Sequence, residues 1–450
     1  MPSPKESSPN STLMTVKRMS HKVLDHSQLS RTTKSSLFSA ISFAVIFFII
    51  IYTDISVSNL PMHTIDLRSH EVLDHNHDHT QVPQEQIEST FITNQSTPQL
   101  SIQAKIEELE DEIRDPLVPP ENATRVERLV WFRRKLPELE ILKSNNLSQQ
   151  FHGRVLEFLN NGCSLQFYMV WLSPAKSFGE RDFLTMDTLF KSHPQGCLMI
   201  ISNSMDSARG YRILKPLLDR GFKILAITPD LPFLVKNTPA ESWLEELKSG
   251  RTDPGYIPLS QNLANLIRLA MLYKYGGIYL DTDFIILKDL SGLRNAIGAQ
   301  SLDSETKIWN RLNGAVMIFD INHPILLDFL EEFATTFNGN KWGHNGPYLV
   351  SRVIARLEGS GRSLDYNLTI LPPQAFYPLD WHRIHRIFRK PEKGSESRAV
   401  EITLNELNAR ETYAVHLWNK RSRQLAIGEG SVMAGLISEH CVICQDLYVS

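Results

Sequence analysis

Two aspartates, Asp281 and Asp283, stand one residue apart in the stretch KYGGIYLDTDF, directly after an apolar segment. In an extended chain, residues i and i+2 point the same way, so both carboxylates can face one point beyond a strand end. Two such carboxylates repel each other and lose hydration, and a divalent cation relieves both penalties. Oxygen ligands suit Mg²⁺ or Mn²⁺, which often bind one or two carboxylates together with substrate phosphates. The pair predicts a metal–diphosphate site, and the alternative is a surface turn with two solvated acids.

The segments before this pair predict the elements that position it. Residues 259–277 carry apolar side chains at helical spacing, and Gly276 and Gly277 are expected to end that helix. The following IYL is a short buried strand that delivers the chain to Asp281. Upstream, expected strands at 165–173, 197–202 and 222–228 alternate with expected helices at 180–194 and 208–221. Such alternation predicts an α/β domain with a parallel sheet, in which ligands bind at the carboxyl ends of strands.

The N-terminal region predicts a membrane anchor. The run Leu37–Thr53 has no charge and is about the shortest length that spans a bilayer. Basic residues precede it and acidic residues follow it, which places the N-terminus in the cytosol and the remainder in the lumen. A buried core helix is the alternative. The chain has 450 residues and a formal charge of −3, and the lack of a basic bias argues against a nucleic acid partner.

The predicted organisation has four parts: a cytoplasmic tail (1–36), a transmembrane signal anchor (37–53), a lumenal stem (54–150) and a catalytic domain (151–450). The stem is rich in Ser, Thr, Gln, Pro and acidic residues, with few aromatics. It contains a short heptad seam that would pair two stems, formed by Ile102, Ile106, Leu109 and Ile113. The seam is shorter than three or four heptads, so homodimer and monomer both stay open.

A lumenal location predicts N-glycosylation and disulfides. Four sequons follow the apolar run, at Asn94, Asn122, Asn146 and Asn367. Cys163 and Cys197 begin two strands that are expected to be neighbours, which favours a disulfide between them. Cys441 and Cys444 form a lone CxxC, for which a disulfide of open connectivity is favoured over zinc because no second ligand pair has suitable spacing.

The stretch IRLAMLYKYGGIYLDTDFIILKDL resembles the DxD sugar-binding region of glycosyltransferase family thirty-two. Within that family it is similar to the lumenal α-1,4-glycosyltransferases that transfer galactose or N-acetylglucosamine. The resemblance covers about residues 190–445 and continues in order through LNGAVMIFD, WGHNGPYLVSRV, LPPQAFYPLDW and YAVHLWNKRS. It implies a GT-A fold with a Rossmann-like mixed sheet, a UDP-linked sugar donor, Mn²⁺ or Mg²⁺, and retention of anomeric configuration. It also implies a Golgi membrane enzyme with a glycan or glycolipid acceptor.

The resemblance assigns roles around the metal and the diphosphate. Asp281 and Asp283 match the DxD aspartates that contact the metal and the donor. His416 falls where related folds bring a histidine to the metal, and Trp418 falls where they bring a tryptophan to the diphosphate. Lys420 could neutralise the leaving diphosphate. From the residues alone, a histidine such as His416 is more often structural.

Further roles concern the sugar. Arg268 matches an arginine that faces the donor sugar, although by itself it could form a surface salt bridge. Asn313 and Gly314 match donor-binding positions. His344 and Asn345, in WGHNGP, could contact the sugar or the acceptor, or simply cap the helix that follows.

One departure from the family pattern affects the donor site. The family carries Ser-Asp where this chain has Ala264 and Asn265. Asparagine keeps one acceptor but loses the charge and adds an NH₂ donor, so the donor sugar is left open. This change also supports a second reading, a non-catalytic relative that binds nucleotide sugar or metal. A third reading, a Mg²⁺-dependent phosphatase of the haloacid-dehalogenase type, fits less well because Ile285 stands at its fifth motif position.

Overall fold

The computed structural model describes residues 117–408 and 411–443, apart from the side chains at 363 and 364. The predicted anchor Leu37–Thr53, the heptad seam and the sequon at Asn94 lie outside this part of the chain, as does Cys444. In the described ranges, no helix combines the length and the apolar character that a bilayer span requires.

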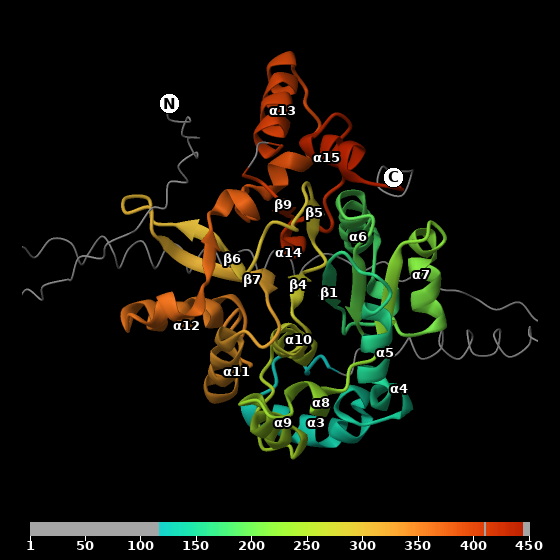
Figure 1. The fold of residues 1–450 in the computed structure, drawn as a ribbon, viewed down its shortest axis with the longest axis vertical. Helices are drawn as coiled ribbons and strands as arrows, with labels where there is room; N and C mark the ends of the chain where they lie inside the picture. The colour runs from blue at the N-terminus through green and yellow to red at the C-terminus, as the bar shows by residue number, and fades with distance from the viewer. Residues whose placement is uncertain (1–116, 409–410, 444–450) are drawn as a thin grey trace, which may run out of the picture. The chain divides into compact units, whose positions relative to one another are not determined.

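Seven strands form one mixed sheet in the order β3-β2-β1-β4-β7-β6-β8, and β5 pairs with β9 in a second, two-stranded sheet (Figure 1). The strands are β1 (Gln166–Val170), β2 (Cys197–Ile201), β3 (Lys223–Ile227), β4 (Gly277–Leu280), β5 (Phe284–Ile286), β6 (Ala296–Leu302), β7 (Trp309–Phe319), β8 (Thr369–Leu371) and β9 (Ala414–His416). The first four run parallel, whereas β7 is antiparallel to both β4 and β6. The sheet is therefore parallel on one side of β4 and mixed on the other.

Helices cover both faces of this sheet. In the described residues they are α3 (Arg125–Lys135), α4 (Asn146–Gln149), α5 (Phe151–Leu159), α6 (Glu180–Ser192), α7 (Ala208–Leu218), α8 (Leu231–Val235), α9 (Ala240–Lys248), α10 (Leu259–Tyr275), α11 (Pro324–Thr336), α12 (Pro347–Gly359), α13 (Gly394–Leu407), α14 (Asn419–Ser422) and α15 (Val432–His440). The elements expected from residue 165 to Asp281 are all present, so the predicted α/β class is confirmed.

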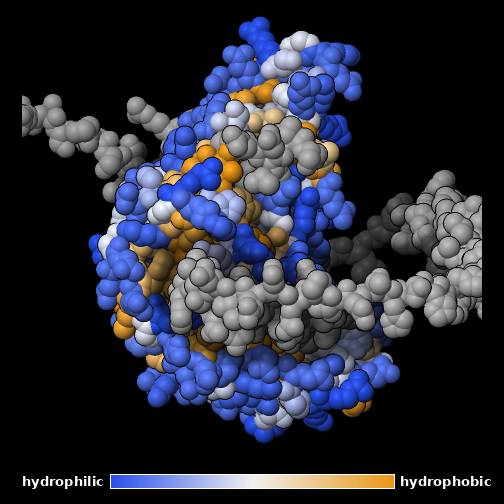
Figure 2. Space-filling model, turned by 90° about the vertical axis from the view of Figure 1, so that its right-hand side faces the viewer, coloured by the Kyte–Doolittle hydropathy of each residue, from blue (hydrophilic) through white to orange (hydrophobic). Residues whose placement is uncertain are grey.

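The core consists of two apolar layers, one on each face of the sheet. Phe167 and Met169 of β1 pack with α6, α7 and α15, whereas Tyr168 between them packs with α10 and α11 on the other face. Successive strand residues point to opposite faces, so a strand buried on both sides needs apolar residues at every position. Outside, hydrophilic residues (blue) cover most of the described surface visible in Figure 2, with hydrophobic residues (orange) in narrower bands.

Residues 117–150 belong to the packed domain, not to an extended stem. Leu117, Phe132 and Leu142 are buried in the same apolar layer as α10 and α11. Thr124 caps α3 through its side chain, with Glu127 returning the hydrogen bond. The compact domain therefore begins before Phe151, where the sequence analysis placed its start. Polar composition concealed this segment, because only a few apolar side chains in it reach the core.

The glycine pair ends α10 as expected, and tertiary contacts make both glycines necessary. Gly276 and Gly277 have φ values of 63° and 103°, a region that disfavours residues with a Cβ. A Cβ on Gly276 would also lie 2.6 Å from the amide nitrogen of Ile321. The turn from α10 into β4 is thus tightly constrained, and this constraint sets where β4 delivers Asp281.

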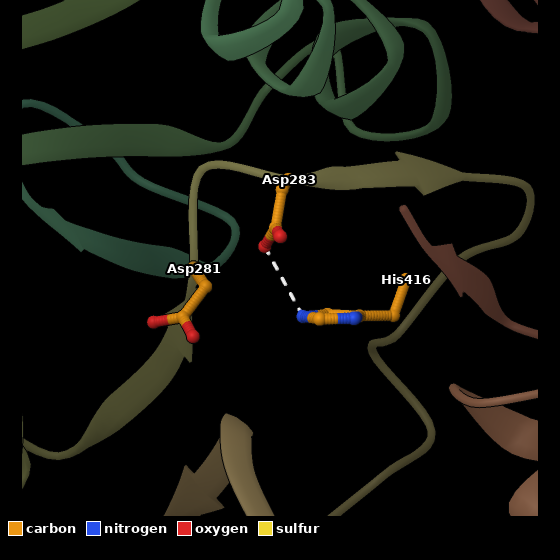
Figure 3. A group of neighbouring side chains, drawn as sticks. All are labelled: Asp281, Asp283 and His416. Carbon is orange, nitrogen blue, oxygen red and sulfur yellow. Dashed lines mark ion pairs between the residues drawn. The ribbon is translucent and has the colours of Figure 1, made fainter. Parts of the chain in front are cut away.

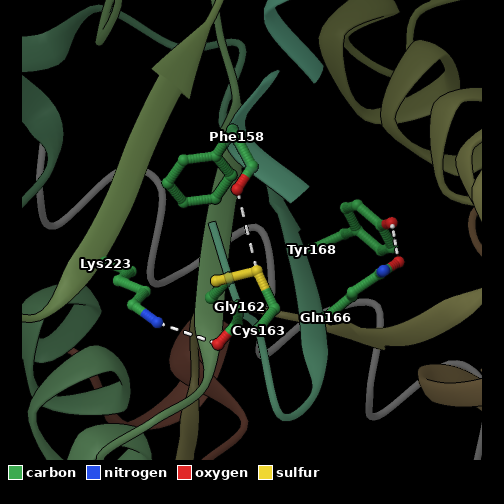
Figure 4. Close-up of a disulfide and its surroundings, with 7 residues drawn as sticks. Phe158, Gly162, Cys163, Gln166, Tyr168 and Lys223 are labelled. Atoms are coloured by element: carbon green, nitrogen blue, oxygen red, sulfur yellow. Dashed lines mark hydrogen bonds between the residues drawn. A yellow bond between two sulfur atoms is a disulfide. The ribbon is translucent and has the colours of Figure 1, made fainter. Parts of the chain in front are cut away.

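The predicted disulfide between Cys163 and Cys197 is confirmed, with a Cα–Cα distance of 5.3 Å (Figure 4). It joins the segment before β1 to the first residue of β2. Nearby, the Lys223 ammonium donates to the carbonyl oxygen of Gly162 at 2.9 Å. These links hold the amino ends of the three parallel strands together. Cys441 is also disulfide-bonded.

Candidate functional site

The two aspartates lie directly after the carboxyl end of β4. The amide of Asp281 donates to the carbonyl oxygen of Ala315 on β7 at 2.8 Å, which fixes the end of the strand. Three residues after Asp281 the chain enters β5, where Phe284 pairs with His416 of β9. This two-stranded pairing brings His416 beside Asp283, although the two residues are more than a hundred positions apart. The two aspartates and His416 therefore come together only in the tertiary structure.

Asp281, Asp283 and His416 form a compact cluster of metal-ligating groups (Figure 3). One oxygen from each carboxylate and one ring nitrogen all lie within 4.8 Å of one another. The Nε2 atom of His416 is 3.2 Å from the Asp283 carboxylate. The structure thus brings together the three residues that the sequence analysis named as metal ligands. Two carboxylates and one imidazole are a donor set that Mn²⁺ or Mg²⁺ accepts.

The two carboxylates differ in the direction of their pKa shifts. Burial raises the pKa of Asp281, and the Asp283 charge adds to this, while the Arg268 charge opposes both. Burial also acts to raise the pKa of Asp283, but the His416 charge and hydrogen bonds from His416 and the Asn419 amide prevail, so its pKa is lowered. Asp283 is thus the firmly ionised member of the pair. A bound cation would favour the ionised form of both.

Arg268 of α10 acts as the partner of Asp281. Its guanidinium lies 3.1 Å from the Asp281 carboxylate and donates to the Gly314 carbonyl oxygen at 2.6 Å. It also lies over the ring of Tyr279, whose hydroxyl donates to Asp281 at 2.7 Å. Arg268 lines the cleft as well, so it can reach a ligand without leaving Asp281. The alternative of a surface salt bridge does not apply, since its side chain is only 12% exposed.

Asn265 lies one turn before Arg268 and faces the same cleft. It is 7% exposed, and its side-chain amide has no hydrogen bond to any residue of the described ranges. Its carboxamide packs on Gly346, where a Cβ would lie 2.8 Å from the Asn265 oxygen. The polar atoms of this amide are not fully buried, so they face the open cleft and are suited to bind a polar ligand group.

Asn313 and Gly314 lie on β7 beside the cluster. The Asn313 amide donates to Gln300 at 3.1 Å, and its oxygen accepts from the Ala315 amide at 3.0 Å. Asn313 lines the cleft, whereas Gly314 lies behind it and receives the hydrogen bond from Arg268. A Cβ at Gly314 would lie 3.6 Å from the Arg268 guanidinium. Gly314 thus acts on the site indirectly, because its carbonyl oxygen and its lack of a side chain fix the position of Arg268.

The WGHNGP loop between α11 and α12 separates its two polar residues. Asn345 is buried at the cleft wall, where its amide donates to Asn262 at 2.9 Å and its oxygen accepts from the Asn338 amide at 3.0 Å. His344 does not line the cleft, and its ring bonds the Thr336 carbonyl oxygen at 2.8 Å. The geometry gives His344 a loop-fixing position and leaves Asn345 as a wall residue.

Trp418 and Lys420 follow His416 at the start of α14. The Trp418 indole meets the His416 ring edge-on, with ring centroids 4.2 Å apart, and donates to the Leu379 carbonyl oxygen at 2.8 Å. The Lys420 ammonium lies 3.6 Å from the centre of the exposed Trp342 ring. Both residues line the cleft.

Asp182 completes the site, and sequence reasoning missed it. Its buried carboxylate accepts from Arg423 at 2.6 Å and from the hydroxyl of Thr282, between the two aspartates, at 3.2 Å. It also lies 3.5 Å from the Asn419 side-chain amide, and the Asn419 backbone amide donates to Asp283 at 2.9 Å. Asp182 therefore ties the DxD turn to the segment that carries His416. Its only sequence signal is an acid in the first turn of α6, which caps many helices.

These residues line a cleft of about 770 Å³ at the carboxyl end of β4. Its walls come from β1, α10, the β6–β7 hairpin, the loop before α12, and α14. The volume is within the range of small-molecule and cofactor sites. Its position agrees with the rule that open α/β sheets bind ligands beyond the carboxyl ends of their strands.

Two family models match the chain. The glycosyltransferase sugar-binding region containing the DXD motif matches residues 179–303. The α-1,4-glycosyltransferase conserved region matches residues 318–448. The first contains both aspartates, and the second contains His416, so the two matches meet in the cluster.

Relatives agree with these models. Lactosylceramide 4-alpha-galactosyltransferase of Mus musculus is 34% identical over 267 residues, 57% of this chain and 68% of that protein. An uncharacterized Arabidopsis thaliana protein is 30% identical over 302 residues, 64% of this chain and 44% of that protein, so the chain spans less than half of that relative. Among solved structures, the PaToxG glycosyltransferase aligns at 17% identity with a TM-score of 0.33, over 53% of this chain and 83% of that one. The identities, coverage and family models agree that the chain belongs to the α-1,4-glycosyltransferase family, with its DxD-containing sugar-binding region.

Proposed function

We propose that this chain is a metal-dependent, retaining glycosyltransferase of the GT-A architecture. It moves a hexosyl or N-acetylhexosaminyl group from a UDP-linked donor to a glycan or glycolipid acceptor and forms an α-linkage. The observation that carries the proposal is the Asp281–Asp283–His416 cluster in a cleft large enough for a nucleotide sugar. Family membership supports the reaction class.

Asp281, Asp283 and His416 would hold the metal, and Mn²⁺ or Mg²⁺ suits them. When bound, the ion supplies charge neutralisation to the diphosphate leaving group. Lys420 extends from α14 beside the cluster, where its ammonium can bind an outer phosphate oxygen. Arg268 keeps Asp281 in place through the 3.1 Å ion pair. The chain thus provides both the ligands and a separate cation for the leaving group.

The donor sugar would lie against α10. Asn265 offers an unpaired amide, and Arg268, one turn away, offers a guanidinium directed into the same cleft. Residues three apart on a helix share a face, so the two can contact one sugar ring together. The amide can both donate and accept, unlike the carboxylate of the family pattern. Donor choice is therefore expected to differ from relatives that keep the aspartate.

The first experiment is nucleotide binding by Asp283→Asn. Calorimetric titration with UDP and Mn²⁺ should show near-complete loss of metal-dependent binding, while the thermal melting temperature stays close to wild type. Asp289→Asn is the matched control, since its exposed carboxylate lies on the loop after β5, away from the cluster. Unchanged UDP–Mn²⁺ affinity in Asp283→Asn would remove the basis of the proposal.

The second candidate is a non-catalytic binder of nucleotide sugars, which Asn265 favours because it removes a charged donor contact. A panel of UDP- and GDP-sugars, assayed for hydrolysis without acceptor, separates the two. A transferase hydrolyses at least one donor slowly, and a pure binder hydrolyses none. A wild type inert with every donor but active as Asn265→Asp would favour the binder. The phosphatase alternative predicts a preference for phosphomonoesters in the same assay.

We further propose a Golgi membrane location, with the anchor Leu37–Thr53, a cytosolic N-terminus and a lumenal catalytic domain. The charge asymmetry around the anchor supports this orientation. Pairing of two chains through the stem stays part of the proposal, with the heptad seam as its support. Protease added outside sealed microsomes should leave the catalytic domain intact, and its digestion would show the opposite orientation.

A further inference from the structure

The cleft carries more positive charge than its own acids balance. Two carboxylates line it, Asp281 and Asp283, against five cationic side chains in the described residues: Arg268, Arg311, Lys420, Arg421 and Arg423. Arg268 pairs with Asp281, and Arg423 pairs with Asp182. The other three have no carboxylate partner within the described part of the chain, and each lies over an aromatic ring.

Lys420 and Arg421 belong to the diphosphate side of the cleft. They directly follow Asn419, whose backbone amide donates to Asp283. Cations at this place meet the charge of the donor diphosphate. Their presence is accounted for by the proposed reaction.

Arg311 lies elsewhere. The Ala315 carbonyl oxygen on β7 accepts a hydrogen bond from Asp281, and Arg311 lies four residues before Ala315, toward the β6–β7 hairpin. Four residues of a fully extended strand span at most ~13 Å, at about 3.3 Å per residue, and the pairing of β7 with β6 is irregular here. That separation is longer than the metal–phosphate contacts at the cluster. Arg311 therefore lies toward the β6–β7 hairpin end of the cleft, and the proposal assigns the acceptor to that end.

The surroundings of Arg311 hold its guanidinium ready for a ligand. It lies 4.8 Å from the centre of the Tyr348 ring and is half-buried. Tyr348 is in turn backed by the loop at Gly343, where a Cβ would lie 2.9 Å from the ring. The side chain of Gln300, on the paired strand β6, lines the same wall. A half-buried guanidinium without a counterion has lost part of its hydration, and the aromatic ring replaces only part of that loss. An anion bound there would pair with the charge and supply the missing hydrogen-bond acceptors.

We propose that Arg311, with Tyr348 and Gln300, forms an acceptor subsite that binds an anionic group of the acceptor: a carboxylate, a sulfate or a phosphate. The planar guanidinium matches the two-oxygen edge that these groups share. The proposal rests on the proposed transferase function and names the acceptor class for the same cleft. The Tyr348 and Trp342 rings also line the cleft and offer apolar surface against which a sugar ring can lie.

The test uses four matched glycosides: octyl β-galactoside, the octyl galacturonide, and octyl β-galactoside carrying a 6-sulfate or a 6-phosphate. They differ only at C6, so the arms separate carboxylate, sulfate and phosphate from the neutral sugar. Transfer rates are measured with the best donor of the sugar-nucleotide panel. Binding is measured in parallel by saturation-transfer NMR with UDP and Mn²⁺ present, which requires no turnover.

Wild type should bind at least one acidic glycoside about tenfold more tightly than the neutral one, since a hydrogen-bonded charge contact has that magnitude. Arg311→Gln should reduce the ratio to about one. UDP–Mn²⁺ affinity should stay within about twofold, because Arg311 lies outside the donor contacts. Lys307→Gln removes the same charge from the exposed turn of the same hairpin and should leave the ratio unchanged.

A wild type that binds all four glycosides equally, binds none of them, or keeps its preference in Arg311→Gln overturns the acceptor subsite. If Lys307→Gln lost the preference for acidic glycosides as fully as Arg311→Gln, the acceptor subsite would also be overturned. The preference would then come from the overall positive charge of the hairpin and not from Arg311. Failure of the transferase proposal looks different: UDP–Mn²⁺ binding itself is absent in wild type. The two failures are therefore read from separate titrations.

Discussion

Asp182→Asn is expected to weaken the metal site without unfolding the domain. The Asp182 carboxylate receives hydrogen bonds from Arg423 and Thr282, and its second oxygen accepts from the Gly179 amide at 3.0 Å. Asparagine has the same size and retains one acceptor oxygen, so the cap on α6 can persist. The amide nitrogen, however, repels the Arg423 and Thr282 donors. The turn between Asp281 and Asp283 then loses its tie to α14.

The magnitude follows from how Asp182 acts on the ligands. Residues that hydrogen-bond directly to metal ligands typically change metal affinity 10- to 100-fold when mutated. Asp182 acts one step further out, through Thr282 and Asn419, so the lower end is expected. The affinity for Mn²⁺ in the presence of UDP should fall about tenfold, which corresponds to about 1.4 kcal/mol.

The assay is a Mn²⁺ titration followed by the EPR signal of the free ion, with saturating UDP. Asp187→Asn is the control, because Asp187 is a buried carboxylate on the same helix that accepts from the Val442 and Ile443 amides at 2.8 Å. It should lower the melting temperature but leave Mn²⁺ affinity unchanged. A folded Asp182→Asn protein with wild-type Mn²⁺ affinity would contradict this prediction. An equal loss in Asp187→Asn would show only a general structural effect.

Four further predictions concern the disulfide, the donor wall at Asn265, glycosylation and the pH dependence of stability. Cys163→Ser should lower the free energy of unfolding by about 3–4 kcal/mol, measured by denaturant titration, because the bond closes a 34-residue separation; an unchanged midpoint would contradict this. Gly346→Ala should raise the donor KM about tenfold, because its Cβ would displace the Asn265 carboxamide from a ligand; an unaltered KM would show that Asn265 does not contact the donor. The exposed Asn367 should carry an N-glycan if the domain is lumenal, so Asn367→Gln should remove one glycosidase-sensitive mass step, and identical masses before and after glycosidase would count against that orientation. Burial raises the pKa of Asp182 to about 6 from 3.8, so protonation favours the folded state. As pH rises from about 4 to 6, wild type should therefore lose about 2 kcal/mol of unfolding free energy relative to Asp182→Asn; parallel stability curves for the two proteins would contradict it.

Local pattern in the sequence determined the α/β class and the first part of the site. Apolar runs alternating with helical periodicity predicted β1 to β4 and α6, α7 and α10, and the structure has each of them. Period and turn chemistry act within a few residues, so they can be read without knowing the fold. The same applies to Asp281 and Asp283, whose common direction follows from a spacing of two.

Only the tertiary structure decided which distant residues complete the site. Nothing in the spacing of Asp182 or Thr282 relates them, since a hundred residues separate them and the contact depends on how α6 packs on β5. The family resemblance implied that His416 lies near the metal, but the β5–β9 pairing that places it beside Asp283 had no signal in the local pattern. His344 shows the converse: its motif suggested a ligand contact, but the loop turns its ring onto the Thr336 carbonyl oxygen.

The packed segment before Phe151 has the same explanation. Its polar composition is typical of a stem, and only the few apolar residues that reach the core, such as Phe132, show otherwise. Composition averages over a window, whereas burial depends on which side chains find partners in space. Residue types and short spacings along the sequence thus determined which chemistry the chain could perform. Packing decided where that chemistry is assembled, because a site made from separated segments has no local signature.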